Sequence, residues 1–256
     1  MVKNIHANGK VALITGAGSG IGRAAALALQ RTGHTVVLAG RKIVSLNETR
    51  DLGQKKGPKM VSVPTDIGIE SEIVSLFKQI QTNFGRLDLL FNNAGVGTPN
   101  VPTEEVTLED WNTCVSVNLT GAFLCSREAI RIMKTQSPKG GRIINNGSVS
   151  AHVPRPHSAA YTATKHGMTG LTKSIALDGR QHDIACSQID IGNADTALAA
   201  QMKTGMLQPD GEVCAEPVID VHHCSETIAH IANLPLDTNV MFVTLMATKM
   251  PYVGRG

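Results

Sequence analysis

The sequence predicts an α/β fold in which helices cover both faces of a parallel, seven-stranded sheet. Short runs rich in Val, Ile and Leu alternate with helix-length segments along most of the chain. Strands this apolar are typical of a sheet buried on both faces, as parallel sheets are. The 256 residues are 42% hydrophobic and 18% charged, a globular composition that needs no disulfide or metal to hold its core. We therefore expect a single doubly wound domain over residues 1–256.

The expected strands are short and rich in aliphatic residues. In chain order they are 10–15, 35–39, 60–64, 87–91, 142–146, 184–190 and 241–247. The first and fourth of these lead into glycine-containing loops, and segments of helical length separate the strands along the chain.

The expected helices are longer and have apolar residues at helical spacing, as at Ile73, Phe77 and Ile80. They are 20–32, a polar stretch that ends near Lys56, 70–83, 108–134 and 158–178. Gly33 follows the first helix, in the position where glycine commonly ends one.

Residues 193–218 have the least regular pattern, and we expect them to form a mobile lid over a substrate. Met202, Met206 and Leu207 would supply its apolar face. Ordinary helix packing explains these three residues equally well.

Charge and cysteine content exclude several classes of protein. The net charge is only +3, and no block of like charges indicates nucleic-acid binding. No run of 18 apolar residues predicts a membrane span, and the first ten residues lack the apolar core of a secretion signal. The five cysteines form no C-x-x-C pair, which favours reduced thiols in the cytoplasm.

A glycine-rich loop, TGAGSGIG at 15–22, joins the first strand to the first helix. Glycines let the backbone approach a pyrophosphate closely, and the following helix N-terminus offers free N–H groups. A glycine-rich turn without a ligand is the alternative, but the strand–loop–helix context favours dinucleotide binding. The candidate contacts are Gly16, Gly18, Ser19, Gly20, Ile21 and Gly22.

Tyr161 and Lys165 are four residues apart in the helix expected at 158–178, so their side chains share one face. A nearby ammonium stabilises an ionised phenol and so makes tyrosine a usable acid–base group near neutral pH. Alone, this spacing is common and equally fits a surface tyrosine beside a solvated lysine.

The motifs together are more specific than any one of them. TGAGSGIG, NNAG at 92–95, Asn118 in VNLTG, Ser148 and the Tyr161–Lys165 pair follow one another in this order. In this order and spacing the chain resembles the short-chain dehydrogenase/reductase family over nearly its whole length. The resemblance implies a Rossmann fold and hydride transfer with a nicotinamide cofactor.

The resemblance also implies a role for each catalytic candidate. Tyr161 would be the general acid in carbonyl reduction and the base in alcohol oxidation. Ser148 would hydrogen-bond the substrate oxygen. Lys165 would hold the nicotinamide ribose and stabilise ionised Tyr161, and Asn118 would anchor a water that relays protons to Lys165.

Further cofactor contacts follow from the resemblance. Asp66 would contact the adenine, and Asn92 and Gly95 would line the adenosine side of the cleft. The candidate cofactor contacts beyond the glycine loop are Arg41, Asp66, Ile67, Asn92, Ala94, Gly95, Tyr161, Lys165, Gly192, Ala194 and Thr196.

The sequence departs from the family pattern at two places. Ile191 stands where the family usually has a proline before Gly192, so the loop that follows is expected to be less rigid. The last strand runs into ATKMPYVGRG instead of the usual Asp-Gly-Gly.

The end of the second strand indicates which cofactor is used. NAD-specific folds usually place Asp or Glu there to bond the ribose 2′-hydroxyl. Here the strand ends in Gly40-Arg41-Lys42, and Arg41 offers a donor fork suited to a 2′-phosphate. We therefore expect NADP(H), with NAD(H) as the alternative if Arg41 faces solvent.

The sequence thus predicts an NADP(H)-dependent oxidoreductase acting on a small-molecule carbonyl or secondary alcohol. A non-catalytic dinucleotide-binding sensor or scaffold, and a 3-oxoacyl-carrier reductase, are the alternatives. No metal site is expected, because His222-His223-Cys224 has no second ligand pair and better fits a helix start. His152 and His157 flank the substrate side and are expected to be exposed loop residues. By resemblance the chain forms a homo-oligomer, commonly a tetramer.

Overall fold

The computed structural model describes residues 9–253. Its centre is a seven-stranded sheet with the order β3-β2-β1-β4-β5-β6-β9, in which every neighbouring pair is parallel. The strands are β1 (Val11–Thr15), β2 (Thr35–Gly40), β3 (Met60–Pro64), β4 (Leu89–Asn92), β5 (Gly141–Asn146), β6 (Ile184–Ile191) and β9 (Phe242–Leu245). This confirms the predicted fold class, with all seven predicted strands present.

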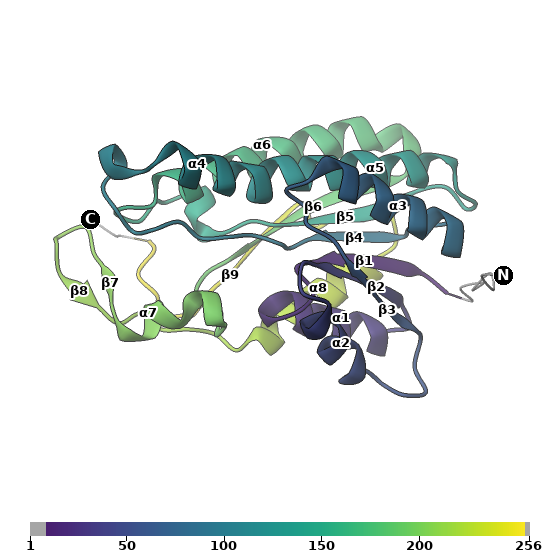
Figure 1. Cartoon of the computed structure of the whole chain (residues 1–256), viewed down its shortest axis with the longest axis horizontal. Coiled ribbons are helices and arrows are strands. Elements are labelled where there is room, and N and C mark those ends of the chain that lie inside the picture. Colours follow the sequence, from purple (N-terminus) through teal and green to yellow (C-terminus); the bar gives the residue numbers. More distant parts are fainter. Residues whose placement is uncertain (1–8, 254–256) are drawn as a thin grey trace.

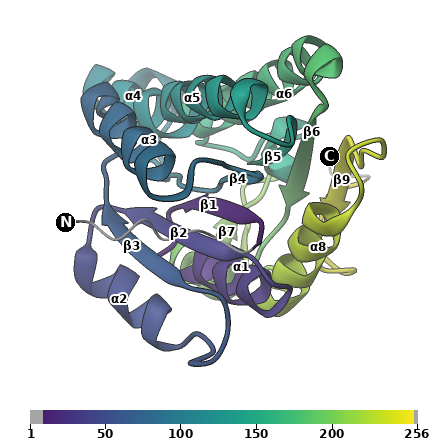
Figure 2. The same cartoon turned by 90° about the vertical axis from the view of Figure 1, so that its right-hand side faces the viewer.

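Helices form a layer on each side of the sheet (Figure 1). One layer holds α3 (Glu70–Phe84), α4 (Leu108–Val115), α5 (Ala122–Thr135) and α6 (Ala159–Gly179), and the other holds α1 (Gly20–Arg31), α2 (Ile43–Asp51) and α8 (Val221–Asn233). Figure 2 shows the two layers edge-on, with the sheet between them. The order reverses between β1 and β4, and in open α/β sheets ligands bind beyond the carboxyl ends of the strands at such a point.

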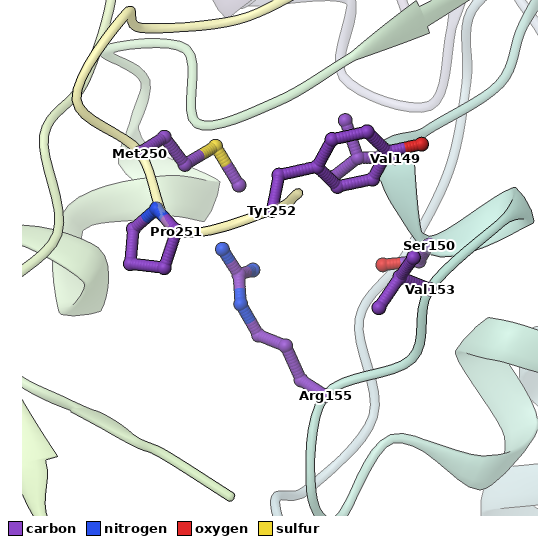
Figure 3. A pocket seen from close by; sticks show the side chains of 7 residues that line it. All are labelled: Val149, Ser150, Val153, Arg155, Met250, Pro251 and Tyr252. Atoms are coloured by element: carbon purple, nitrogen blue, oxygen red, sulfur yellow. The ribbon is translucent and has the colours of Figure 1, made fainter. Parts of the chain in front are cut away.

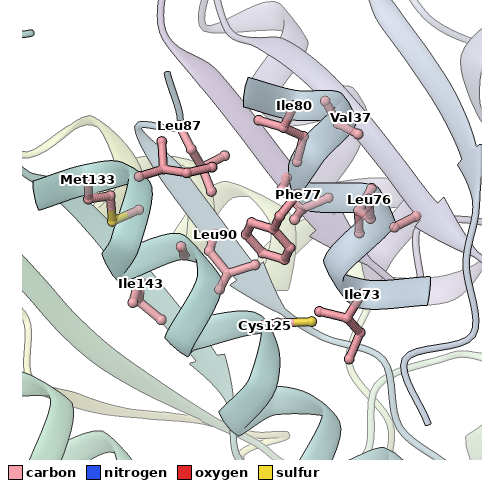
Figure 4. Close-up of a cluster of buried hydrophobic side chains, with 14 of the residues drawn as sticks. Val37, Ile73, Leu76, Phe77, Ile80, Leu87, Leu90, Cys125, Met133 and Ile143 are labelled. Carbon is pink, nitrogen blue, oxygen red and sulfur yellow. The ribbon is translucent and has the colours of Figure 1, made fainter. Parts of the chain in front are cut away.

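Each face of the sheet has its own apolar core. Leu13 and Leu90 belong to the core beneath α3 and α5, while Ile14 and Phe91 belong to the core beneath α1 and α8. Figure 4 shows the first core, where Phe77 of α3 lies among aliphatic side chains. Because successive strand residues point to opposite faces, this alternation anchors both helix layers to one rigid sheet.

The segment expected as one helix at 108–134 differs from the prediction. Helix α4 ends at Val115, a π-helical turn covers Ser116–Gly121, and α5 then begins at Ala122. Single π-turns within α-helices often occur at functional sites. Here the turn contains Asn118, and a Cβ at Gly121 would lie 2.5 Å from the Ile67 carbonyl oxygen, so the helix passes very close to the loop after β3.

Residues 193–218 contain little regular structure, as the sequence predicts. They hold the short helix α7 (Ala200–Thr204) and a two-stranded hairpin of β7 (Met206–Leu207) and β8 (Val213–Cys214). In Figure 1 these elements form an arm at one end of the molecule. None of the helices among residues 9–253 is long and apolar enough to cross a membrane.

Candidate active site

The glycine loop between β1 and α1 has a backbone that only glycine suits. Gly16 and Gly20 have φ values of +66° and +50°. A Cβ at Gly22 would lie 2.2 Å from the Gly16 carbonyl oxygen. Ser19 makes no side-chain cap to α1, and the first turn of α1 has no acidic residue. The N-terminus of α1 therefore keeps donors and a positive dipole end for an anionic group, as a pyrophosphate requires.

Arg23 and Thr49 hold this loop from behind, and the sequence analysis did not identify them. The Arg23 guanidinium donates to the Gly18 carbonyl (2.6 Å), to Thr49 Oγ1 (3.0 Å) and to Glu48 (2.9 Å). Thr49 Oγ1 in turn donates to the Ala17 carbonyl at 2.9 Å. Helix α2, which carries Glu48 and Thr49, thus fixes the loop through contacts that form only when it packs beside α1.

The NNAG segment after β4 lies directly against the glycine loop. Asn93, another residue missed from sequence, donates to the Thr15 carbonyl at 2.9 Å, and a Cβ at Gly16 would lie 2.9 Å from Ala94 Cα. Gly95 is exposed. Asn92 is buried, and its amide donates to Ser126 and to Asn145 at 2.9 Å each. Of the NNAG side chains, the Asn92 amide thus faces the core while Asn93 bonds the loop.

Asn118 is buried in the π-turn and bonds the chain that follows NNAG. Its Oδ1 accepts from the Val96 N–H at 2.8 Å, and its Nδ2 donates to the Val96 carbonyl at 2.9 Å. The same amide lies 3.4 Å from Thr164 Oγ1 on α6, one residue before Lys165. The structure therefore brings Asn118 next to the helix that carries Tyr161 and Lys165.

Tyr161 and Lys165 share a face of α6, as predicted. Lys165 Nζ lies 5.4 Å from the centroid of the Tyr161 ring and donates to the Asn146 carbonyl at 2.7 Å. Lys165 is buried, whereas Tyr161 is half-buried. The lysine charge is held next to the phenol, while the phenol remains reachable.

Ser148 lies two residues after the end of β5 and is buried. Its Oγ accepts a hydrogen bond from the Ser150 N–H at 3.1 Å, and its own N–H donates to Asp190 Oδ1 at 3.0 Å. The hydroxyl oxygen is thus fixed while its proton stays available to a substrate oxygen. Asp190 is a fourth residue that sequence reasoning missed, although a carboxylate within the buried strand β6 is a visible irregularity.

The loop after β6 reaches the glycine loop. Thr196 Cγ2 lies 3.0 Å from the position of a Cβ at Gly20, so the two predicted cofactor loops touch. Ala194 is buried and pairs with Ile219, and the Gly192 N–H donates to the Leu245 carbonyl. Ile191 is the last residue of β6 and pairs with Leu245. Gly192 and Ala194 are therefore held by backbone pairing even though the usual proline is absent.

Asp66, Ile67 and Arg41 lie in the loops after β3 and β2. Asp66 Oδ1 accepts from the Gly68 N–H at 2.9 Å, Ile67 is buried in the core, and Arg41 is exposed. Within residues 9–253, the Arg41 side chain has no hydrogen bond or ion pair, so its guanidinium is free to bind a ligand.

A small cavity separates the loop after Ser148 from the C-terminal segment. Val149, Ser150, Val153 and Arg155 line one side, and Met250, Pro251 and Tyr252 the other (Figure 3). It holds about 10 Å³, room for one water molecule but not a substrate. Arg155 forms a buried ion pair with Glu216 and donates to Asn193 at 2.8 Å, which ties the arm to the loop before α6.

The described residues contain no group of three or more His, Cys, Asp or Glu arranged to hold a metal ion. His222, His223 and Cys224 lie in the first turns of α8, which Asp220 caps by accepting from the His222 N–H. The prediction of a helix start there is confirmed. Four of the five cysteines are buried, and burial raises the pKa of the Cys125 and Cys186 thiols to about 12.

Known proteins resemble this chain in sequence and in fold. The family profile described as short chain dehydrogenase matches residues 10–206. A 3beta-hydroxysteroid dehydrogenase of Mediterraneibacter gnavus is 36% identical over 208 residues, covering 78% of this chain and 72% of that protein.

Two solved structures share the fold over nearly the full length of both chains. A 3-ketoacyl-(acyl-carrier-protein) reductase from Brucella melitensis, complexed with NADH, has a TM-score of 0.83 at 27% identity and covers 94% of this chain and 98% of that one. An actinorhodin polyketide ketoreductase variant with NADPH has a TM-score of 0.84 at 26% identity, covering 93% and 96%. The chain therefore belongs to the short-chain dehydrogenase/reductase family, and it is an oxidoreductase of the alcohol–carbonyl class.

Proposed function

We propose that this protein is an NADP(H)-dependent oxidoreductase that transfers a hydride reversibly between nicotinamide and a carbonyl or secondary alcohol. The observation that carries the proposal is the placement of Lys165 Nζ, 5.4 Å from the Tyr161 ring centroid and bonded to the carbonyl that ends β5. Ser148 lies two residues beyond that carbonyl, with its hydroxyl oxygen fixed. A non-catalytic dinucleotide sensor would not need this arrangement.

The residues present fit a dinucleotide. The glycine loop is a cradle that a Cβ at Gly16 or Gly22 would close, and the uncapped N-terminus of α1 suits the pyrophosphate. Gly192, Ala194 and Thr196 would border the nicotinamide, and Asp66 the adenine. When bound, the nicotinamide supplies or accepts the hydride.

In carbonyl reduction the protein supplies one proton and a polar environment for the reacting oxygen. The Ser148 hydroxyl donates a hydrogen bond to that oxygen and stabilises the charge that develops on it. Tyr161 donates its phenolic proton to the oxygen, and the nearby Lys165 ammonium stabilises the phenolate that remains. In alcohol oxidation the ionised Tyr161 removes the hydroxyl proton. Asn118 would anchor the water through which Tyr161 and Lys165 exchange protons with solvent.

The preference for NADP(H) is supported by the end of β2. Gly40 leaves space where NAD-specific folds carry a carboxylate, and Arg41 is exposed with a free guanidinium. A guanidinium binds a phosphate with two parallel hydrogen bonds, which a ribose hydroxyl does not offer. The two structural neighbours include one complex with NADH and one with NADPH, so both cofactors occur in proteins of this fold.

The substrate class is a small molecule with a ketone or a secondary hydroxyl. The named relatives act on a 3β-hydroxysteroid and on a 3-ketoacyl group, which have this functional group in common. We propose that the arm at 193–218 closes over such a substrate. Met206, a buried residue of β7, would be part of its apolar lining.

We further propose a cytoplasmic homo-oligomer, a tetramer by family resemblance. Leu108, Trp111 and Phe123 are exposed on α4 and α5, which suits burial against another copy. The unpaired thiols suit a reducing compartment. Size-exclusion chromatography with light scattering tests the assembly, and a monomer at micromolar concentration would contradict it.

The test of function is oxidation of NADPH and NADH in the presence of a panel of ketones, ketoesters and quinones. Tyr161→Phe should lower kcat by about 10²–10⁴-fold while cofactor affinity stays nearly unchanged. Tyr252→Phe, at the only other tyrosine, is the matched control. Cofactor binding without turnover of any substrate would favour the sensor, and a Tyr161→Phe variant with more than about a tenth of wild-type kcat would exclude the proposed mechanism.

A further inference from the structure

The buried carboxylate of Asp190 lies directly beneath the loop that carries Ser148. Asp190 is 1% exposed, and its Oδ1 accepts from the Ser148 N–H at 3.0 Å and from Gln188 Nε2 at 2.8 Å. Its Oδ2 lies 2.7 Å from His152 Nε2. An ionised carboxylate only accepts hydrogen bonds, so Nε2 carries the proton in this contact. We propose that Asp190 and His152 are positioning residues for Ser148 in the reaction proposed above.

The loop approaches this carboxylate more closely than any side chain at position 147 would allow. A Cβ at Gly147 would lie 1.9 Å from Asp190 Oδ1. Glycine at position 147 is therefore what permits an aspartate at position 190. The two residues are 43 positions apart in sequence, yet each is sterically matched to the other.

The carboxylate fixes the backbone that carries the Ser148 hydroxyl. Ser148 has an extended backbone, its N–H is held by Asp190, and its Oγ is held by the Ser150 N–H. These two contacts fix the backbone of Ser148 and the oxygen of its side chain. Without the carboxylate, the Ser148 N–H and the Gln188 amide would lose a buried acceptor, and the loop would shift to find another.

The same carboxylate ties Ser148 to the helix that carries the acid–base pair. Gln188 Nε2 also donates to Thr169 Oγ1 at 3.0 Å, and Gln188 Oε1 accepts from Thr172 Oγ1 at 3.0 Å. Thr169 lies one helical turn after Lys165 and two turns after Tyr161, on the same face of α6. Asp190 and Gln188 therefore connect Ser148, on the β5 loop, to the face of α6 that presents Tyr161.

His152 completes the arrangement from the solvent side. Its side chain is 39% exposed, and its contact with Oδ2 prevents the carboxylate from turning away from the Ser148 N–H. The Asp190 carboxylate is bonded to the Ser148 N–H, Gln188 Nε2 and His152 Nε2. His157 lies in the same loop as His152 and is not one of these three partners. Variants of His152 and His157 therefore form a matched pair, because the His152 variant alters the contact with Asp190 Oδ2 and the His157 variant does not.

The experiment measures kcat, substrate KM and cofactor Kd for the wild type and for variants at positions 190 and 152. Asp190→Ala should lower kcat about 10²-fold, with cofactor Kd within about twofold of wild type, since a misplaced group of this kind costs about that much. Asp190→Asn keeps an acceptor oxygen for the Ser148 N–H and should recover most of the loss. His152→Ala should lower kcat about tenfold, His152→Gln should restore it by supplying a donor of similar reach, and His157→Asn should have no effect.

A double-mutant cycle separates positioning from general damage. In a Ser148→Ala background, Asp190→Ala should produce no further loss of kcat, because the group it positions is absent. An equal loss in both backgrounds, or full activity in Asp190→Ala, would overturn the proposal. If Asp190→Ala does not fold, the His152→Ala and Ser148→Ala cycle decides the question at the exposed end. Should Ser148→Ala itself retain full activity, the proposed function fails instead, and the two failures are distinguishable.

Discussion

Asn118 and the backbone of Val96 are joined by two hydrogen bonds of opposite direction. The Val96 N–H donates to Oδ1 at 2.8 Å, and Nδ2 donates to the Val96 carbonyl at 2.9 Å. The buried Asn118 amide thus pairs with the backbone of the loop after β4 as a neighbouring strand would. This pairing fixes the loop beyond NNAG to the π-turn and places both next to α6.

Asn118→Ala should lower stability by about 1–3 kcal/mol, because two backbone groups of Val96 lose their partners in a buried place. It should also lower kcat if Asn118 anchors the water proposed to relay protons to Lys165. Urea unfolding and steady-state kinetics measure the two effects. Asn233→Ala removes an amide that bonds the Ala229 carbonyl at the surface of α8, and it should change stability by less than about 0.5 kcal/mol. An unchanged unfolding midpoint in Asn118→Ala would contradict the structural role.

Lys165→Ala should lose cofactor affinity and activity together, because the ammonium is assigned both ribose binding and support of Tyr161. Lys165→Arg, if active, should shift its pH–rate profile toward higher pH, since the guanidinium charge is more diffuse and differently placed. Lys173→Ala, at an exposed lysine two turns further along α6, is the control. Normal cofactor binding by Lys165→Ala, measured by titration calorimetry, would exclude the double role.

Wild-type protein should bind NADPH at least about tenfold more tightly than NADH, the value of one charge-assisted hydrogen bond. The Gly40→Asp, Arg41→Ala double variant should reverse the preference, because the new carboxylate repels the 2′-phosphate. The aspartate fits, since a Cβ at Gly40 would meet Leu46 Cδ2 at an ordinary 3.4 Å. Arg50→Ala, at an exposed arginine of α2, should leave the preference unchanged. Equal or tighter NADH binding by the wild type would identify NAD(H) as the cofactor.

Acid should loosen the arm at 193–218 through Glu216. Burial opposes ionisation of this carboxyl, but hydrogen bonds from Asn193 and Gln208 and the charge of Arg155 outweigh burial, so the pKa of Glu216 lies below its ordinary value. A lowered folded-state pKa stabilises the fold at pH above the ordinary carboxyl value of about 4.3. That stability is lost as the pH falls through the lowered value.

Glu216→Gln should therefore destabilise the protein by about 3–5 kcal/mol at pH 7, because it leaves a buried arginine without its charge partner. The difference from wild type should shrink between pH 5 and pH 3. Glu226→Gln removes an exposed partner of Arg31 and should cost less than about 1 kcal/mol at either pH. Unfolding free energies across this pH range provide the measurement, and a pH-independent difference would show that ionisation of Glu216 is not responsible.

Only one thiol per chain should react rapidly with Ellman's reagent in the native protein. Cys214 is exposed, whereas the other four cysteines are buried, and burial raises the pKa of Cys224 to about 11 and of Cys125 and Cys186 to about 12. A thiol that stays protonated and covered is a poor nucleophile. Cys214→Ser should abolish the rapid reaction, and all five thiols of the wild type should react after denaturation. Two or more rapid thiols in the native protein would contradict this packing.

Much of this architecture could be predicted because its causes are local. The strand β1, the glycine loop and the start of α1 are consecutive, so a sequence window contains the whole phosphate cradle. Tyr161 and Lys165 likewise lie on one helix, and their shared face follows from helical geometry. The order of the motifs then identified the family.

The parts that were missed depend on which elements meet in space. Asn93 bonds the Thr15 carbonyl, 78 positions away, and Arg23 bonds the Gly18 carbonyl, 5 positions away. The residues next to them in sequence do not indicate this role. The π-turn at Ser116–Gly121 lies where Gly121 approaches Ile67 closely, and a helical pattern alone does not reveal that contact. Asp190 was visible as a carboxylate in an apolar strand, but its partners Ser148 and His152 lie on another element.

Because Gly147 and Asp190 match each other sterically, the two positions have to be exchanged together. A chimaera that joined this chain's β6 to a relative's β5 loop bearing a side chain at position 147 would place a carbon 1.9 Å from a carboxylate oxygen. The reverse chimaera would join this chain's β5 loop to a relative's β6 without the aspartate, and the Ser148 N–H would then lose its acceptor. Recombination libraries built on this protein should therefore keep crossover points outside residues 147–190, and substrate-range mutagenesis should vary the two positions jointly.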